Sequence, residues 1–291
     1  GQDHPPRLAG GEQLMPADLS LVSPAKLNLF LHITGRRPDG YHQLQTLFQL
    51  LDWGDDMHFT ANNSGRIALH SPALDIPDDE NLVLSAATLL QRGNLGAEIT
   101  LEKRIPTGGG LGGGSSNAAS TLLALNHLWN LGHSRKTLQD MGRELGADVP
   151  VFVAAHTAWA EGIGEILTPV ELPQRWYLIL TPDCHVSTAE IFSHRQVTRN
   201  TSPIKIAAFF EGHYRNDCQE LVRDLHPEVD KALKVLEKFG DARLTGTGAC
   251  VYCAFDSAPQ ALGACSKVPS RFSSFVARGM NRSPLLEAAR S

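Results

Sequence analysis

Glycine dominates one short stretch of the chain, RIPTGGGLGGGSSNAAS at residues 104–120, in which residues 108–114 hold six glycines in seven positions. Ordering them is costly, because each glycine loses more conformational freedom on folding than any other residue. The pattern predicts an apolar strand before the loop and a helix after it. The backbone N–H groups of such a loop, together with a helix N-terminus, can bind phosphate. We interpret the stretch as a phosphate loop. A flexible surface loop is the alternative, although flexible linkers are rarely held between a strand and a long helix.

Several known phosphate loops do not fit this stretch. A P-loop requires G-x-x-x-x-G-K-[ST], and no lysine precedes Ser115 or Ser116. The dinucleotide pattern G-x-G-x-x-G is met from Gly108 to Gly113, but a run of glycines meets it almost automatically. That fold also needs a second strand that ends in an acid about 20 residues further on, where a helix through Leu131 is predicted here. The chain has no H-R-D or D-F-G element, which argues against a protein kinase.

Two charged residues stand in apolar surroundings. Lys26 interrupts the strand-like run SPAKLNL, and Asp148 lies in GADVP, between a predicted helix and a predicted apolar strand. Taken alone, such a lysine is usually a solvated residue on a strand face, and such an aspartate usually belongs to a helix end or turn. The residues by themselves leave open whether they have these ordinary structural roles or a chemical one.

Other elements must position these residues. Before the loop, the pattern predicts strands over 19–33 (broken near Pro24), 42–53, 55–61, 65–71 and 97–105, and a helix within 77–93. After the loop it predicts helices over 115–131 and 134–146, an apolar strand after Asp148 and a strand pair within 157–170. The remainder is read as strand 176–181, helix 187–192, helices within 217–240, strands 242–247 and 249–255, helix 257–265 and strand 271–279. This last β-α-β-β-α-β order predicts an α/β sandwich with an antiparallel sheet.

The length of 291 residues favours one large or two medium domains. The segment PVELP, residues 169–173, is the expected boundary between an N-terminal domain, 15–170, and a C-terminal domain, 171–291. Residues 1–14 are polar, contain glycine and proline, and precede Met15. We expect them to be an extension or tag.

Composition excludes several classes of function. Hydrophobic residues make up 42% of the chain, yet no apolar run approaches the roughly 18–20 residues of a membrane span. No secretory signal precedes the first strand, so we expect a cytoplasmic protein without a membrane partner. The net charge of −5 argues against binding of nucleic acid, which a basic surplus would favour. The five cysteines are scattered and complete no zinc site, so buried free thiols are expected.

The frame P-x-x-x-G-L-G…S-S-x-A-A runs from Pro106 to Ala119. It resembles the phosphate loop of the galactokinase, homoserine kinase, mevalonate kinase and phosphomevalonate kinase superfamily, the GHMP kinases. The longer form GGGLGGGSSNAA is similar to one family among them, whose members phosphorylate a cytidine diphosphate ester of methylerythritol in the non-mevalonate isoprenoid pathway. SPAKLNLFLHITGRRPDGYH, LGADVPVF and LTGTGACVYCAF resemble the same family, in order, from about residue 19 to 276. Four motifs in order are far more specific than one glycine loop.

The resemblance implies a two-domain α+β fold, with an ATP-binding N-terminal α+β domain and a ferredoxin-like C-terminal α/β sandwich. The active site would lie between the domains. The implied reaction transfers the γ-phosphate of ATP to the C2 hydroxyl of a small-molecule substrate.

The resemblance also implies roles for single residues. Asp148 matches the general base, with Lys26 as its catalytic partner. Asn28 would contact the substrate, while Tyr41 and Phe192 would sandwich its cytosine and His42 would hydrogen-bond the edge of the base. Gly246 and Gly248, in LTGTGAC, match a segment that returns to the phosphate site. The expected nucleotide-binding residues are Pro106, Thr107, Gly108, Gly109, Gly110, Leu111, Gly112, Gly113, Gly114, Ser115 and Ser116.

Three features stay open at this stage. ATP chemistry implies Mg²⁺, for which Ser115 or Ser116 could supply one oxygen, but the sequence does not identify an acidic ligand. Lys103 and Arg104 flank the loop, where local positive charge and simple solvation are equally compatible with the pattern. The oligomeric state, monomer or weak homodimer, is not determined by the sequence.

Overall fold

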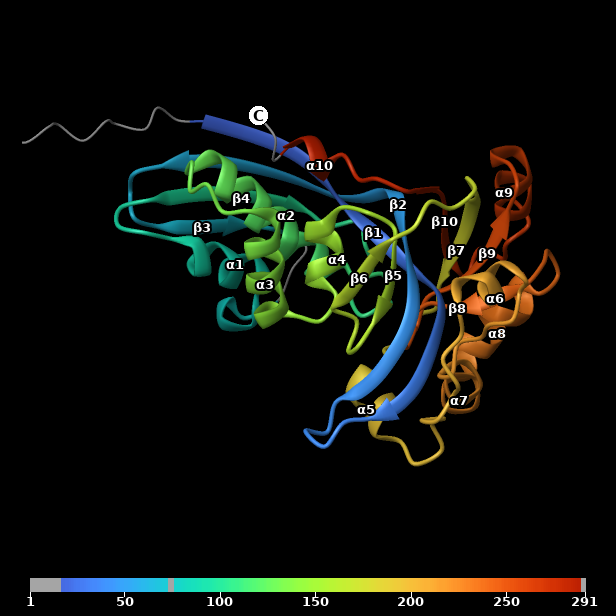
Figure 1. Ribbon diagram of the computed structural model, residues 1–291. Coiled ribbons are helices and arrows are strands. Elements are labelled where there is room, and N and C mark those ends of the chain that lie inside the picture. Colours follow the sequence, from blue (N-terminus) through green and yellow to red (C-terminus); the bar gives the residue numbers. More distant parts are fainter. Residues whose placement is uncertain (1–16, 73–75, 289–291) are drawn as a thin grey trace, which may run out of the picture.

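Two long strands connect the two halves of the molecule. The computed structural model describes residues 17–72 and 76–288, so the predicted extension 1–14 lies outside the described residues. Strands β1 (Ala17–Arg36) and β2 (His42–Asn62) pair antiparallel from Ala17 opposite Ala61 to Arg36 opposite His42. They run from one half of the molecule to the other, and their tips reach α5 (Figure 1). The strand break expected near Pro24 is a shift of register within one continuous strand, because a bulge accommodates a residue that has no N–H for the ladder.

The N-terminal half places helices against a mixed sheet. Strand β2 pairs with β1, β4 and β5; β4 also pairs with β3, and β5 with β6. The strands are β3 (Ile67–His70), β4 (Gly96–Glu102), β5 (Ala158–Glu161) and β6 (Ile166–Pro169). The helices are η1 (Asp78–Glu80), α1 (Leu82–Leu90), α2 (Gly113–Leu128), α3 (Arg135–Leu145) and α4 (Val149–Ala154), with α10 (Leu285–Ala288) returning to this half from the end of the chain.

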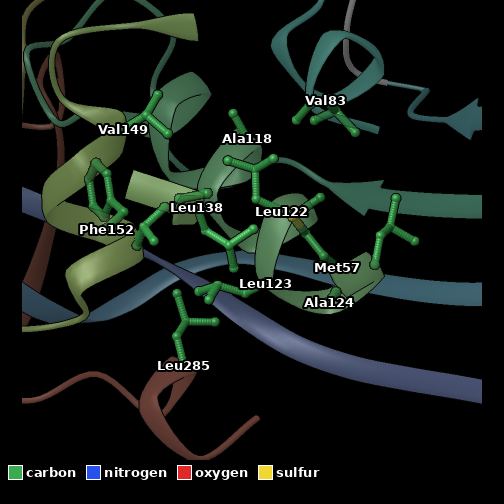
Figure 2. Packing of buried hydrophobic residues seen from close by; sticks show 14 of the residues in the cluster. Met57, Val83, Ala118, Leu122, Leu123, Ala124, Leu138, Val149, Phe152 and Leu285 are labelled. Carbon is green, nitrogen blue, oxygen red and sulfur yellow. The ribbon is translucent and has the colours of Figure 1, made fainter. Parts of the chain in front are cut away.

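Helix α2 lies at the centre of this half and anchors the end of the glycine loop. Every residue from Ser116 to Leu125 is buried, so the helix is packed on all sides rather than along one stripe. Small residues such as Ala118 let neighbouring elements approach, and Leu122 and Leu123 contribute to a core shared with Met57 and Phe152 (Figure 2). Each fully buried leucine contributes about 1.5–3 kcal/mol. The helix that follows the loop is therefore firmly held.

The C-terminal half has the predicted β-α-β-β-α-β order. Its sheet runs β10-β7-β9-β8 and is antiparallel throughout, which is the ferredoxin-like arrangement, so that prediction is confirmed. The strands are β7 (Trp176–Thr181), β8 (Ala242–Leu244), β9 (Val251–Phe255) and β10 (Ser273–Met280). The helices are α5 (Thr188–Ser193), α6 (Ile206–Phe210), α7 (Gln219–Leu225), α8 (Pro227–Leu236) and α9 (Ala258–Cys265). The short helix α6 was not predicted.

The two halves share one path of strands. Strand β10 pairs with β7 on one side and, at Gly279 and Met280, with Leu51 and Leu50 of β2 on the other. An irregular segment over residues 170–175 joins β6 to β7 at the place where a domain boundary was expected. The boundary itself stays a prediction.

Three local predictions were wrong. The strands expected over 42–53 and 55–61 form the single strand β2, which continues through Gly54. The apolar run after Asp148 forms helix α4 instead of a strand, since periodicity cannot distinguish a short buried strand from a short buried helix and Pro150 fits a first helical turn. Helix α2 begins at Gly113 rather than Ser115, and its N-cap is Gly112, with no side-chain cap among the described residues. The last two glycines therefore belong to the helix.

Candidate active site

A cavity of about 560 Å³ lies where the two halves meet. Its N-terminal wall contains residues of β1, the glycine loop and the start of α4. Its C-terminal wall contains residues of α5 and of the turn after β8. The lining includes Lys26, Asn28 and Asp148 as well as Phe192 and Thr247. Residues from motifs that are far apart in the sequence thus line the same cavity.

The glycine loop is shaped by contacts that leave no room for side chains. Gly110 has φ +76°, and a Cβ there would lie 2.3 Å from the backbone oxygen of Thr245. Gly112 has φ +74°, and a Cβ there would lie 2.8 Å from the ring of Phe152. L-residues rarely adopt this backbone region, and here the space is also filled. Glycine is required at both positions.

The loop carbonyls are bound to the protein. The Cys250 N–H donates to Gly109 O (3.1 Å), and Thr245 Oγ1 (3.2 Å) donates to Gly110 O. Lys26 N–H donates to Leu111 O at 3.0 Å. The first turn of any helix has N–H groups without an intrahelical acceptor, and here Gly112, Gly113, Gly114 and Ser115 line the cavity. The arrangement offers N–H donors to an anion.

Ser115 and Ser116 differ in position. Ser115 borders the cavity, whereas Ser116 is fully buried and its Oγ lies 2.9 Å from Ser23 Oγ. Leu111, another predicted nucleotide-binding residue, is also fully buried and belongs to the hydrophobic core. At Leu111 only the backbone is a candidate for contact with a ligand, whereas the Ser116 N–H already donates to Gly112 O (2.8 Å).

Lys26 and Asp148 form the expected pair. Lys26 Nζ lies 3.2 Å from Asp148 Oδ2, and the lysine side chain is 4% exposed while that of the aspartate is 33% exposed. The same ammonium donates to Asn28 Oδ1 (2.6 Å) and to Gly110 O (3.0 Å). Asp148 is the N-cap residue of α4, but within the described chain its side chain does not cap the helix. The carboxylate is thus held beside a cation and remains open to the cavity.

Asn28 is fixed from both sides. Its Nδ2 donates to Thr46 Oγ1 (3.0 Å), and its backbone N–H donates to Thr245 Oγ1 (3.0 Å). A residue of β1 is thereby tied to both β2 and the turn after β8. Its orientation toward Lys26 is built into the fold.

The predicted site for the cytosine ring is arranged differently from expectation. The rings of His42 and Phe192 stack with centroids 5.2 Å apart and planes 25° apart, and Arg199 Nε donates to His42 Nε2 at 3.2 Å. Burial lowers the pKa of His42, and the neighbouring Arg199 and Arg36 lower it further. Tyr41 is 62% exposed at the turn between β1 and β2. A base stacked on this face of Phe192 would require His42 to turn away.

Lys103 and Arg104 are separated by the structure. The Lys103 side chain is 9% exposed, lies on the cavity wall and pairs with Asp55, with Nζ 2.5 Å from Oδ2. Arg104 is half exposed and pairs with Asp56. Positive charge near the loop therefore comes from Lys103. The sequence alone could not distinguish this residue from Arg104, because the two are adjacent.

Sequence reasoning did not find a second pair of polar residues. Thr188 Oγ1 and Thr247 Oγ1 lie 2.9 Å apart on the C-terminal wall of the cavity. Thr247 stands between the two glycines of LTGTGAC, which was the signal available in the sequence. Thr188 had no comparable signal.

Comparisons with known proteins agree over nearly the whole chain. A family described as GHMP kinases N terminal domain matches residues 81–156, and one described as GHMP kinases C terminal matches residues 198–274. A curated 4-diphosphocytidyl-2-C-methyl-D-erythritol kinase from Pseudomonas savastanoi pv. phaseolicola is 52% identical over 277 residues, which cover 94% of this chain and 96% of the relative. A protein of the same name from Pseudomonas aeruginosa UCBPP-PA14 is 53% identical over 274 residues, 93% of this chain and 97% of the relative.

Solved structures give the same result. A crystal structure of 4-(cytidine 5'-diphospho)-2C-methyl-D-erythritol kinase matches with a TM-score of 0.76 at 31% identity, over 90% of this chain and 99% of that one. Homoserine kinase from Cytophaga hutchinsonii has a TM-score of 0.64 at 16% identity over 91% of this chain and 95% of its own, which shows the shared fold. The chain belongs to the GHMP kinases and, within them, to the family of 4-diphosphocytidyl-2-C-methyl-D-erythritol kinases.

Proposed function

We propose that this chain transfers the γ-phosphoryl group of ATP to the C2 hydroxyl of 4-diphosphocytidyl-2-C-methyl-D-erythritol. The observation that carries the proposal is the Lys26–Asp148 pair, which faces the same cavity as the glycine loop. A phosphoryl transfer to an alcohol needs bound phosphates, a group that orients the hydroxyl and accepts its proton, and positive charge near the reacting oxygens. All three are offered by residues that line this cavity.

The chemical step is assigned to Asp148. Its carboxylate accepts the hydroxyl proton as the substrate oxygen bonds to the γ-phosphorus. The bond between that phosphorus and the β–γ bridging oxygen breaks, and ADP leaves. The open third of the Asp148 side chain gives the hydroxyl access, while the ion pair with Lys26 fixes the direction of the carboxylate.

Lys26 links the base to the phosphate loop. Its ammonium contacts Asp148, Asn28 and the Gly110 carbonyl together, so one cation fixes the base, a substrate-binding side chain and the loop. Negative charge that develops on the transferred group lies near this cation, which stabilises the transition state more than the ground state. We propose Lys26 as the second catalytic residue.

The glycine loop is proposed to bind the phosphates of ATP through its backbone. The predicted segment from Pro106 to Ser116 supplies N–H groups around a helix start, and the helix dipole favours an anion there. The buried side chain of Leu111 restricts this position to a backbone role, and Ser116, whose N–H donates to Gly112 O, supports the helix start instead. Lys103 adds a cation on the same wall.

Mg²⁺ is compatible with the residues present. Among the described residues there is no group of three or more histidine, cysteine, aspartate or glutamate side chains that could hold a metal ion. Mg²⁺ bound to nucleotide phosphates, however, keeps several waters and needs only one or two protein oxygens. Ser115, which lines the cavity, would supply one of them. When bound, the ion neutralises charge on the phosphate oxygens.

The remaining proposals concern the substrate and the setting. The cytosine ring is proposed to bind at Phe192 on the cavity wall. His42 is stacked on Phe192, and Tyr41 precedes His42 in the sequence.

A cytoplasmic location is supported by the five free cysteines, which suit a reducing compartment. No helix among the described residues is long and apolar enough to cross a membrane.

A coupled assay of ADP release, with ATP, Mg²⁺ and the cytidine substrate, tests the proposed reaction. We expect turnover with this substrate and at least about a hundredfold lower kcat/KM with mevalonate, homoserine or galactose, which lack the cytidine group. Equal or better turnover of one of those alcohols would overturn the proposed substrate.

For the cytosine site, calorimetry of Phe192→Ala and Tyr41→Ala should show weaker binding of the cytidine substrate and unchanged binding of nucleotide. Unchanged binding of the cytidine substrate by both variants would refute the sandwich.

A further inference from the structure

A fully buried carboxylate lies beneath the glycine loop and takes no part in the proposed transfer. Asp55, on β2, has a side chain that is 0% exposed. Its Oδ1 accepts the backbone N–H groups of Arg104 (2.7 Å) and Ile105 (2.8 Å). Its Oδ2 accepts from Lys103 Nζ (2.5 Å) and Asn117 Nδ2 (2.9 Å). Two donors thus bind each oxygen, which is a complete shell for a buried carboxylate.

The four donors lie on both sides of the loop. Residues 103–105 form the end of the chain segment that leads into Pro106, whereas Asn117 belongs to α2, after the last glycine. One side chain on β2 therefore joins the two ends of a loop whose own residues carry almost no side chains. The loop cannot widen or slide along α2 without breaking hydrogen bonds to Asp55.

A second set of contacts completes this attachment. Asn117 Nδ2 also donates to Ser23 Oγ (3.1 Å), which accepts from Ser120 Oγ (3.0 Å) as well. Asn117 Oδ1 accepts from Lys103 Nζ at 3.1 Å. The start of α2 is tied in this way to both long strands, β1 through Ser23 and β2 through Asp55.

Lys103 is where this cluster meets the cavity. Its Nζ lies 3.1 Å from the position that a Cβ of Gly113 would occupy, against the first turn of α2 where an anion is expected. The side chain lines the cavity, and its direction is set by Asp55 and Asn117. A mobile surface lysine would lose side-chain entropy on contact with a phosphate, whereas this one is already ordered.

We propose that Asp55 is a positioning residue for nucleotide binding: it sets the distance between the two ends of the glycine loop and the direction of the Lys103 ammonium. The inference rests on the proposed function, because it concerns how the same loop binds the phosphates of ATP. Asp55 touches neither substrate nor the reacting atoms, and it acts through residues 103–105 and Asn117.

The chemistry of the cluster explains why an acid is required. All four partners of Asp55 are donors, so an asparagine could keep Arg104 and Ile105 on its oxygen but would turn an NH₂ group toward Lys103 and Asn117. Exchanging the two side chains restores the match. In Asp55→Asn/Asn117→Asp, the new amide donates to the new carboxylate, which also accepts from Lys103.

A second buried carboxylate offers a matched control. Asp217 is also 0% exposed, accepts a backbone N–H, from Ile33 (2.8 Å), and pairs with a cation, Arg215 Nε (2.7 Å). It lies in the contacts between β1 and the segment before α7, away from the glycine loop. We expect its replacement by asparagine to destabilise the fold without changing any contact of the loop.

The test measures binding of a non-hydrolysable ATP analogue to folded protein by calorimetry, together with the KM values for ATP and for the cytidine substrate. For Asp55→Asn we expect about 10- to 100-fold weaker analogue binding and a matching rise in the KM for ATP, with the KM for the cytidine substrate unchanged. The double variant should recover most of the affinity. Asp217→Asn should bind the analogue as the wild type does.

The outcomes separate the two proposals. A folded Asp55→Asn protein that binds the analogue within twofold of wild type, while the wild type remains an active kinase, overturns the positioning role alone. A wild-type protein that binds no analogue overturns both proposals. If Asp55→Asn does not fold, Asp55→Glu takes its place: it keeps the charge but changes the spacing, so a wild-type affinity in that variant overturns the positioning role and a weakened affinity supports it.

Discussion

The Lys103–Asp55 pair and the Lys26–Asp148 pair both border the glycine loop, but their carboxylates are satisfied to different degrees. Asp55 is buried and accepts four hydrogen bonds, two at each oxygen. Asp148 is paired through Oδ2 with Lys26, and a third of its side chain is exposed. A carboxylate without spare acceptor capacity can hold structure but cannot receive a proton from a substrate. The open carboxylate is therefore the one suited to chemistry.

The two lysines differ in the same sense. Lys103 contacts two side chains of a closed cluster, while Lys26 contacts Asp148, Asn28 and the Gly110 carbonyl, which belong to different parts of the site. The first arrangement fixes the shape of the glycine loop, and the second connects that loop to Asp148, the proposed base. Composition alone, one lysine and one aspartate in each case, does not distinguish them.

The largest expected effect comes from removing the base function at the open pair. Asp148→Asn keeps the shape of the side chain and an oxygen that can accept from Lys26, but the amide cannot take the hydroxyl proton. We expect kcat to fall by about 10²- to 10⁴-fold. Calorimetry with a non-hydrolysable ATP analogue should show affinity within a few-fold of wild type. Retention of most wild-type turnover with intact nucleotide binding would contradict the assignment.

Replacing each lysine by methionine sharpens the comparison. Lys26→Met should lower kcat by about a hundredfold, since the transition state loses its cation. It should weaken analogue binding to a smaller degree, since the loop loses only the hydrogen bond to the Gly110 carbonyl. Lys103→Met leaves the fully buried Asp55 without its countercharge, which should cost about 3–5 kcal/mol of unfolding free energy and weaken analogue binding. Denaturant unfolding and kinetics on both variants measure these effects. The interpretation fails if Lys103→Met affects turnover more and stability less than Lys26→Met.

The sequence predicted that Lys26 and Asp148 form a pair but did not predict the buried cluster, for a physical reason. Lys26 and Asp148 stand in motifs that a family resemblance can match, and each is a charge in an apolar run. Asp55 follows a glycine after a strand, which in sequence is indistinguishable from an ordinary turn acid. Only the fold brings it to residues 104, 105 and 117, about 50 and 60 residues away.

The fold was predicted best where elements have clear ends. Helix α3 runs from an N-cap at Ser134 to Gly146, both of which the pattern indicated, and the order of the ferredoxin-like half is as expected. Helix α4 was predicted as a strand because its six apolar residues are too few to show a helical period. The start of α2 was placed too late because glycine is a poor helix former, whereas tertiary packing of the following residues decides the matter.

The glycine loop can be altered without replacing a residue of either ion pair. In Gly110→Ala, the new Cβ meets the Thr245 oxygen at 2.3 Å on a backbone with φ +76°. We expect about tenfold weaker analogue binding and a loss of roughly 1–3 kcal/mol in unfolding free energy. Gly132→Ala is the matched control, since Gly132 has φ +70° but no atom within 4 Å of the added Cβ. That variant should lose some stability and bind the analogue normally; equal loss of binding in both variants would remove the steric explanation.

The smallest expected effect concerns the dependence of stability on pH. His32, on β1, is 3% exposed, and its Nδ1 has no hydrogen-bond partner within the described residues. Burial lowers its pKa from the usual 6.5, Arg215 lowers it further, and Asp217 opposes them. The folded state then binds fewer protons than the unfolded state below about pH 6.5, so unfolding free energy should fall with acidification, by at most about 1.4 kcal/mol per pH unit for one group.

His32→Gln tests this contribution, because the amide does not titrate. The glutamine oxygen can still accept the backbone N–H of Arg215, which His32 Nε2 accepts at 3.3 Å. Denaturant unfolding between pH 7.5 and about pH 5 should show a shallower acid loss for the variant than for the wild type. Part of the slope should remain, since the lowered pKa of His42 acts in the same direction. An identical slope in both proteins would show that His32 binds protons equally in the folded and unfolded states, so that folding does not lower its pKa.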